Sequence, residues 1–230
     1  MPIAALIFDV DGTLAETEEI HRAAFADAFA EAGLPWRWDV DLYRDLLKTT
    51  GGKERIRRFL DMRGISASTV SDEAIAALHA RKTAFYGTRV AEGGLALRPG
   101  VERVLREART RGLRLAIATT TSRPNIETLL DVVFGAEAAD LFETLVCGED
   151  VAVKKPAPDA YVEALRRLDL PAEACLAFED SANGLASARG AGLATIVTPS
   201  LYTGHETFDG AAAILENLEA FDLDVWLRRE

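Results

Sequence analysis

The sequence predicts an α/β fold: a parallel sheet with helices on both faces, plus an all-helical segment inserted after the first strand. An apolar run at residues 3–7 opens the chain and is typical of a buried strand. From about residue 98 onward, short apolar runs alternate with helical segments, which is the pattern of a parallel sheet. The residues in between show helical periodicity and no convincing strand.

The inserted segment is expected to contain several helices. Apolar residues are spaced for one helix face over Glu18–Ala32, and Gly33 with Pro35 ends that helix. The further helices expected here are Asp41–Leu47, Lys53–Met62 and Asp72–Tyr86. Because no strand interrupts them, we expect residues 16–91 to form a small helical cap.

The rest of the chain is expected to form the sheet and the helices that cover it. The expected helices are Val101–Arg111, Asn125–Phe134, Asp159–Leu168 and Ala182–Ala191. The expected strands are Leu113–Ala118, Leu145–Cys147, Cys175–Phe178 and Ala194–Val197. The first strand must join this sheet, because it has no other partner. We therefore expect residues 1–15 and 92–230 to form one Rossmann-like α/β catalytic core.

Composition argues against several classes of protein. The 230 residues are 49% hydrophobic, enough for one sizeable core or two modest domains. A net charge of -11 argues against general binding to nucleic acid or to an anionic membrane, since both need basic patches. We expect no signal peptide and no membrane span, and hence a cytoplasmic location. Cys147 and Cys175 lie in apolar stretches and are expected as small core residues in a reducing compartment.

Two carboxylates, Asp9 and Asp11, come directly after the first strand and are followed by Gly12. Side chains alternate along an extended chain, so both acids can leave the strand end pointing the same way. Two acids crowded together are costly unless they share a cation or a proton. The spacing suits a nucleophilic aspartate beside Mg²⁺ and a second aspartate that moves protons. Taken alone, these residues fit an acidic surface turn equally well.

Polar clusters also follow three later strands. They are Thr119–Ser122, Lys154-Lys155-Pro156 and Glu179-Asp180-Ser181. Each has an ordinary alternative: a helix cap, a solvated basic pair, and a helix N-terminus that favours negative charge. Ligands of parallel sheets bind at the carboxyl ends of the strands, so we expect all four clusters to meet there. Acids that can hold Mg²⁺ beside hydroxyls and a lysine that can hold phosphate predict phosphoryl transfer.

In this order, the four clusters resemble the motifs of the haloacid dehalogenase superfamily of phosphatases and mutases. The resemblance implies that Asp9 is the nucleophile that becomes an aspartyl-phosphate. It implies that Asp11 is the general acid and base, with its backbone carbonyl also binding Mg²⁺. The residues that it assigns to the transferring phosphoryl group are Thr119, Thr120 and Lys155, the lysine that directly precedes a proline. The residues that it assigns to the rest of the Mg²⁺ site are Glu179 and Asp180.

Residues 13–19, 49–55, 118–122 and 202–206 resemble the CbbY type of the β-phosphoglucomutase-like branch, found beside carbon-fixation enzymes. The resemblance implies hydrolysis of xylulose 1,5-bisphosphate to xylulose 5-phosphate. Gly51, Gly52 and Lys53 place flexible backbone and a cation at a helix N-terminus, which suits a second phosphate; an ordinary loop is the alternative. Further candidates for substrate contact are Glu18, His21, Lys82, Arg123 and Asn125.

Two alternative functions remain open on the sequence. A β-phosphoglucomutase-type isomerase would use the same residues but return the phosphoryl group to the sugar. A non-catalytic phosphate-sensing protein would gain nothing from a nucleophile. The expected partner is a small-molecule sugar phosphate, with neither nucleic acid nor membrane, and the expected state is a monomer or weak dimer. His79 is expected on the surface of the cap.

Overall fold

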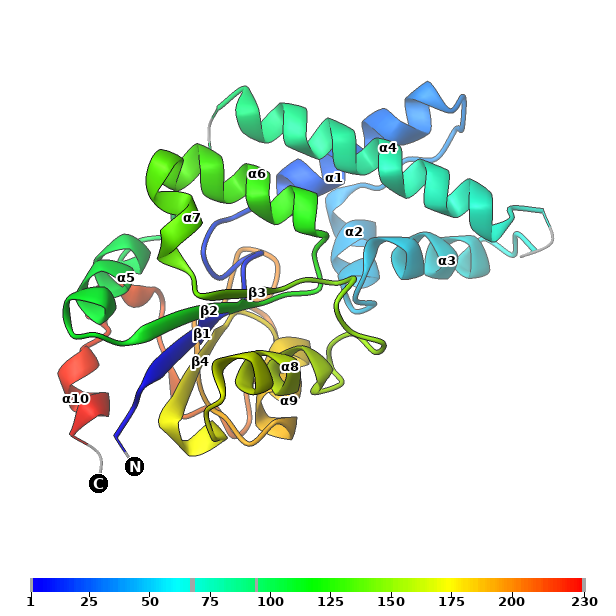
Figure 1. Ribbon diagram of the computed structural model, residues 1–230. Helices are drawn as coiled ribbons and strands as arrows, with labels where there is room; N and C mark the ends of the chain where they lie inside the picture. The colour runs from blue at the N-terminus through cyan, green and yellow to red at the C-terminus, as the bar shows by residue number, and fades with distance from the viewer. Residues whose placement is uncertain (1, 67–68, 94, 229–230) are drawn as a thin grey trace.

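The computed structural model describes residues 2–66, 69–93 and 95–228. Its centre is a six-stranded sheet in the order β3-β2-β1-β4-β5-β6, with every pairing parallel. Figure 1 labels the first four strands of the chain, β1 to β4. The strands are β1 (Ala5–Phe8), β2 (Arg114–Ala118), β3 (Thr144–Val146), β4 (Cys175–Glu179), β5 (Ala194–Val197) and β6 (Ala213–Ile214). The strand order reverses at β1, and ligands of such sheets bind where the order reverses. The predicted fold class is confirmed.

Helices cover both faces of the sheet. They are α5 (Val101–Thr110), α6 (Arg123–Phe134), α7 (Ala138–Leu141), α8 (Asp159–Leu168), α9 (Ala182–Gly190) and α10 (Leu223–Leu227). Alternate strand residues face opposite sides, so Leu6 and Phe8 pack with α5, α6 and α10, whereas Ala5 and Ile7 pack with α8 and α9. Figure 1 shows α5 to α7 on one side of the sheet and α8 and α9 on the other. Both faces are therefore buried, as in other parallel sheets.

The inserted segment forms a layer of helices beyond the carboxyl ends of the strands (Figure 1). The helices are α1 (Glu18–Glu31), α2 (Val40–Leu47), α3 (Gly52–Met62) and α4 (Asp72–Ala91). This helical layer has its own aromatic core, separate from the two cores of the sheet, built around Phe25, Phe29, Trp38, Tyr43 and Phe59. We propose that residues 16–91 are a cap domain that moves relative to the sheet.

The observed elements differ from the predicted ones in two ways. One helix is longer than predicted, and several very short elements were not predicted. Helix α4 runs to Ala91 instead of Tyr86, because the buried Val90 continues the apolar face that includes Tyr86. The elements that the sequence did not predict are α7, β6, α10 and the 3-10 turns Gly135–Glu137, Ala172–Ala174 and Leu218–Ala220. Each has five residues or fewer, too few to show a periodic pattern.

The two cysteines pack as the composition predicts. Cys147 and Cys175 are free and buried, and they belong to the cores on opposite faces of the sheet. Both are therefore small core residues. Among the described residues, no helix combines the length and the apolar character needed to span a membrane.

Candidate active site

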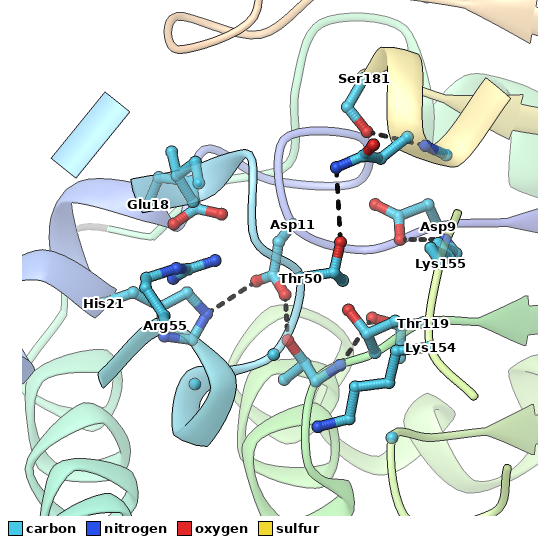
Figure 2. A pocket seen from close by; sticks show the side chains of 18 of the residues that line it. Asp9, Asp11, Glu18, His21, Thr50, Arg55, Thr119, Lys154, Lys155 and Ser181 are labelled. Carbon is cyan, nitrogen blue, oxygen red and sulfur yellow. Dashed lines mark hydrogen bonds and ion pairs between the residues drawn. The ribbon is translucent and has the colours of Figure 1, made fainter. Parts of the chain in front are cut away.

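A cavity of about 240 Å³ lies between the carboxyl ends of the strands and the helical layer (Figure 2). Most of the predicted site residues line it, and they come from both sides. These residues are Asp9, Asp11, Glu18, His21, Gly51, Gly52, Lys53, Lys82, Thr119, Thr120, Asn125, Lys155 and Asp180. The fold thus brings together clusters that lie far apart in the sequence.

Asp9, Lys155 and Glu179 form a buried ionic cluster, of which Asp9 and Lys155 line the cavity. The Lys155 ammonium donates to Asp9 Oδ1 at 2.7 Å and to Glu179 Oε1 at 2.6 Å. Burial raises the pKa of Asp9 to about 8, with Glu179 and Asp11 adding to the shift and Lys155 opposing it. Burial alone would lower the pKa of Lys155, but Asp9 and Glu179 raise it above its ordinary value. Lys155 therefore stays charged beside Asp9.

Three carboxylates in this cluster are placed to hold a metal ion. Asp9, Glu179 and Asp180 each offer an oxygen, and these atoms all lie within 4.8 Å of one another. Burial, and then the charges of Asp9 and Glu179, raise the pKa of Asp180 well above its ordinary value. Three buried carboxylates carry more negative charge than Lys155 balances, and oxygen-only donors suit Mg²⁺ better than Zn²⁺. The residues present thus fit a hard divalent cation.

Asp11 is held by donors from both sides of the cavity. His21 Nε2 lies 3.0 Å from Asp11 Oδ1, and the hydroxyls of Thr17 and Thr121 also donate to this carboxylate. The other ring nitrogen of His21, Nδ1, lies 2.6 Å from Lys82 Nζ. Burial lowers the pKa of Lys82 to about 7. When Lys82 is charged it can only donate, so Nδ1 then accepts and Nε2 carries the proton that His21 gives to Asp11. Lys82 and His21 thereby orient Asp11 from the helical layer.

These donors decide the charge of Asp11. Burial alone would raise the pKa of Asp11, but His21, Thr121 and Thr17 together lower it below its ordinary value. In this arrangement Asp11 is therefore an ionised carboxylate. A phosphate dianion bound next to Asp11 would raise this pKa again, because a like charge disfavours the ionised form.

The loop that carries both aspartates is fixed from behind by Arg98. Its guanidinium donates to the carbonyl of Gly12 and, at 2.7 and 2.8 Å, to the carbonyls of Thr198 and Pro199 after β5. Gly12 has a φ of +80°, and a Cβ there would lie 2.3 Å from Asp180 Oδ2. Only glycine therefore lets this loop approach the candidate metal ligands so closely.

Arg55 is a cavity residue that the sequence analysis missed. It is 9% exposed, and its Nη1 donates to Tyr43 Oη at 2.9 Å. Its Nε is buried and has no hydrogen-bond partner among the described residues, and Figure 2 shows the side chain beside the cavity. A signal was present, because Arg55 shares the buried face of α3 with Ile56 and Phe59, an unusual place for a charge.

Comparisons with known proteins identify the family of this chain. The family model of haloacid dehalogenase-like hydrolases matches residues 3–192. The chain belongs to this family. Protein CbbY of Cereibacter sphaeroides is 52% identical over 216 residues, which cover 94% of this chain and 92% of that protein. Protein CbbY of Rhodobacter capsulatus is 52% identical over 220 residues, 96% of each chain.

Solved structures extend the similarity to the fold. The crystal structure of CbbY from Rhodobacter sphaeroides in complex with phosphate has a TM-score of 0.91 at 48% identity and covers 97% of this chain and 99% of that one. A mutant of that protein in complex with xylulose 1,5-bisphosphate matches equally well. β-Phosphoglucomutase from Clostridium difficile has a TM-score of 0.81 but 19% identity, which shows a shared fold alone. The predicted resemblance to CbbY proteins is confirmed, and the chain is an enzyme, a hydrolase of the phosphatase class.

Two residues of this haloacid dehalogenase-like hydrolase lie elsewhere than predicted. Arg123, a predicted substrate contact, is outside the set of described residues that line the cavity, because its guanidinium donates to Asp150 at 2.7 Å and to the Leu145 carbonyl at 3.2 Å. His79, expected on the surface, lines the cavity instead, and a Cβ on Gly52 would lie 2.4 Å from its Nε2. Burial, and then nearby lysines, lower the pKa of His79 to about 3, so its imidazole is neutral.

Proposed function

We propose that the protein is a Mg²⁺-dependent phosphatase that hydrolyses xylulose 1,5-bisphosphate to xylulose 5-phosphate through an aspartyl-phosphate on Asp9. The main support is a cavity with phosphate-binding chemistry at both ends: Thr119 and Lys155 on the sheet, Lys53 and Arg55 in the helical layer. A substrate with a phosphate at each end would use both. The high similarity to a CbbY protein crystallised with this bisphosphate supports the choice of sugar.

In the first step of the proposed reaction, a carboxylate oxygen of Asp9 attacks phosphorus. A bond forms between Asp9 and phosphorus while the bond from phosphorus to the sugar oxygen breaks, and Asp11 gives its proton to that oxygen. Lys155 and Thr119 would hold the oxygens of the transferring group. Mg²⁺, held by Asp9, Glu179, Asp180 and the backbone carbonyl of Asp11, would supply neutralisation of the phosphoryl charge.

In the second step, water attacks the phosphorus of the aspartyl-phosphate and Asp11 takes its proton. The bond between phosphorus and Asp9 breaks, inorganic phosphate leaves, and Asp9 is ready for another cycle. Between the two steps, the helical layer would keep bulk water out of the cavity. It would also keep His21, which contacts Lys82 through its other ring nitrogen, in contact with Asp11, so that proton transfer takes place only when the cavity is closed.

Metal removal is expected to abolish phosphate release. EDTA would take away the cation that offsets the charge of Asp9, Glu179 and Asp180, and added Mg²⁺ would restore activity. Mg²⁺ should also raise the unfolding temperature of the wild type, because a ligand that binds the native state stabilises it. Asp180→Asn should show a much smaller rise. Full activity in metal-free buffer would contradict the proposed cofactor.

Replacing Lys53 with alanine is expected to lower kcat/KM for xylulose 1,5-bisphosphate. Lys53 lines the cavity from the first turn of α3, on the side opposite Asp9. A charge-assisted contact contributes roughly 1.5–3 kcal/mol, which corresponds to about one to two powers of ten in rate. A small monophosphate cannot reach this site and should be hydrolysed almost as before. Phosphate release with each substrate provides the measurement.

Lys48→Ala is the matched control, since Lys48 pairs with Asp45 and is outside the set of described residues that line the cavity. Equal slowing of both substrates by Lys53→Ala would assign Lys53 to folding or to movement of the helical layer. A wild-type preference for monophosphates would contradict the bisphosphate proposal. Conversion of β-glucose 1-phosphate to glucose 6-phosphate would favour an isomerase instead.

A further inference from the structure

Tyr202 connects the sheet to the aromatic core of the helical layer. It lies in the loop that follows β5, yet it is 3% exposed and belongs to the buried cluster of the helical layer. Its ring meets the ring of Tyr43 edge-on, with centroids 5.7 Å apart at an angle of 87°. Its hydroxyl donates to Glu19 of α1, and the guanidinium of Arg44 lies 5.9 Å from its ring centroid. A side chain from a loop of the α/β core thus packs inside the aromatic core of the helical layer.

The same loop is anchored at the candidate metal site. The Thr203 hydroxyl, next to Tyr202, donates to the backbone carbonyl of Asp180 at 2.7 Å and accepts from the Ser200 amide at 2.8 Å. Farther along, the Glu206 carboxylate accepts from the Ala182 amide at 2.7 Å, where α9 begins. The base of the loop is therefore fixed to the sheet while Tyr202 reaches into the helical layer.

Tyr43 connects Tyr202 to the arginine of the cavity. The Tyr43 hydroxyl donates to Glu18 Oε2 at 2.8 Å and accepts from Arg55 Nη1 at 2.9 Å. The Arg55 guanidinium also lies over the Tyr43 ring, 5.2 Å from its centroid. The ring on which Tyr202 packs is thus the ring that holds Arg55 in place.

We propose that Tyr202 is a positioning residue that locks the helical layer over the bound substrate and, through Tyr43, fixes Arg55 toward the phosphate remote from Asp9. Opening of the layer must withdraw the Tyr202 ring from an apolar cluster and break its hydrogen bond to Glu19, both of which favour the closed state. This inference rests on the proposed function, because it assumes a substrate that reaches both layers.

Two further contacts between the layers are exposed and less able to act as a lock. Lys154 pairs with Glu54 at 2.8 Å, with side chains that are 23% and 46% exposed. The Asn183 amide donates to the Lys48 carbonyl at 3.2 Å at an exposed site. Solvated contacts of this kind contribute little to stability. Two buried links between the layers are the polar contact of His21 with Asp11 and the packing of Tyr202, and of these two only Tyr202 places an aromatic ring in the core of the opposite layer.

The test compares Tyr202→Ala, Tyr202→Phe and the control Leu201→Ala, whose side chain is 75% exposed in the same loop. Hydrogen exchange of the α2 amides measures how often the helical layer opens. The kcat/KM values for xylulose 1,5-bisphosphate and for p-nitrophenyl phosphate measure how much closure contributes to catalysis with each substrate. For Tyr202→Ala we expect faster α2 exchange and a loss in kcat/KM of about 10- to 100-fold for the bisphosphate, because a misplaced distant group has effects of this size. The loss for the monophosphate should be smaller. Tyr202→Phe should lie between wild type and Tyr202→Ala, and Leu201→Ala should match wild type.

If the α2 amides of Tyr202→Ala exchange as slowly as those of the wild type, the proposed lock is wrong, even if the enzyme prefers bisphosphates. Equal losses for both substrates, together with a lower unfolding temperature, would show a structural role only and would also overturn it. If Tyr202→Ala does not fold, the test rests on Tyr202→Phe. A ratio of kcat/KM for the bisphosphate to kcat/KM for p-nitrophenyl phosphate equal to that of the wild type would then overturn the proposal. A wild-type preference for monophosphates would instead refute the proposed function, while the exchange measurement still tests the lock.

Discussion

Asp9→Asn is expected to fold normally and to lose essentially all turnover. The side chain of Asp9 is buried at the end of β1, and its Oδ1 accepts from Lys155 at 2.7 Å. Asparagine keeps the shape and an oxygen acceptor, but an amide cannot form the phosphorylated enzyme. In a serine protease, removal of the nucleophile costs about 10⁶-fold in kcat. Phosphate release from the bisphosphate, measured at saturating Mg²⁺, is the readout.

Measuring the stability of Asp9→Asn distinguishes a loss of catalysis from a failure to fold. Asp9, Glu179 and Asp180 repel one another, so replacing one of them with a neutral residue should leave the metal-free protein at least as stable as wild type. Asp61→Asn, at an exposed position on α3, is the matched control and should keep full activity. Rapid acid quench of the wild type should trap phosphate on Asp9. Wild-type turnover by Asp9→Asn would rule out the covalent mechanism.

The sequence predicted the sheet and the meeting of its polar clusters because both depend on local patterns and one general rule. The run before Asp9 and the run before Glu179 are short, apolar and fully buried, as strands of a parallel sheet are. In a parallel sheet the residues that follow such strands meet at one edge. Asp9 and Asp180 could therefore be placed together although most of the chain separates them.

The contacts that shape the cavity could not be predicted in this way. Arg98 reaches the Gly12 carbonyl, and Tyr202 reaches Glu19, across long stretches of sequence and without a shared periodic pattern. The direction of a long side chain next to a helix N-terminus is equally hidden: Arg123 turns toward Asp150 rather than the cavity. The rotamers of such side chains are decided by tertiary neighbours, which a single sequence does not identify.

Lys155→Met is expected to damage both stability and catalysis. The side chain of Lys155 is 5% exposed, and its ammonium contacts both Asp9 and Glu179 and lies 4.9 Å from the ring centroid of Tyr161. Methionine has a similar shape but no charge, so it leaves the carboxylates without their cation. Removing one partner of a buried ion pair, so that the other charge stays buried, costs roughly 3–5 kcal/mol of stability. Loss of a donor to the transferring group should lower kcat by about 10²- to 10³-fold.

Mg²⁺ and the neighbouring lysine provide the controls for this variant. If the destabilisation of Lys155→Met comes from uncompensated negative charge, saturating Mg²⁺ should reduce it, because the cation would lie among the same carboxylates. Lys154→Met removes the adjacent lysine, whose ion pair with Glu54 is partly exposed, and should change stability by less than about 1 kcal/mol. A larger loss of activity in Lys154→Met than in Lys155→Met would show that the wrong lysine has been assigned to the phosphoryl group. Equal destabilisation of Lys155→Met with and without Mg²⁺ would mean that lost packing against Tyr161, and not charge, explains the effect.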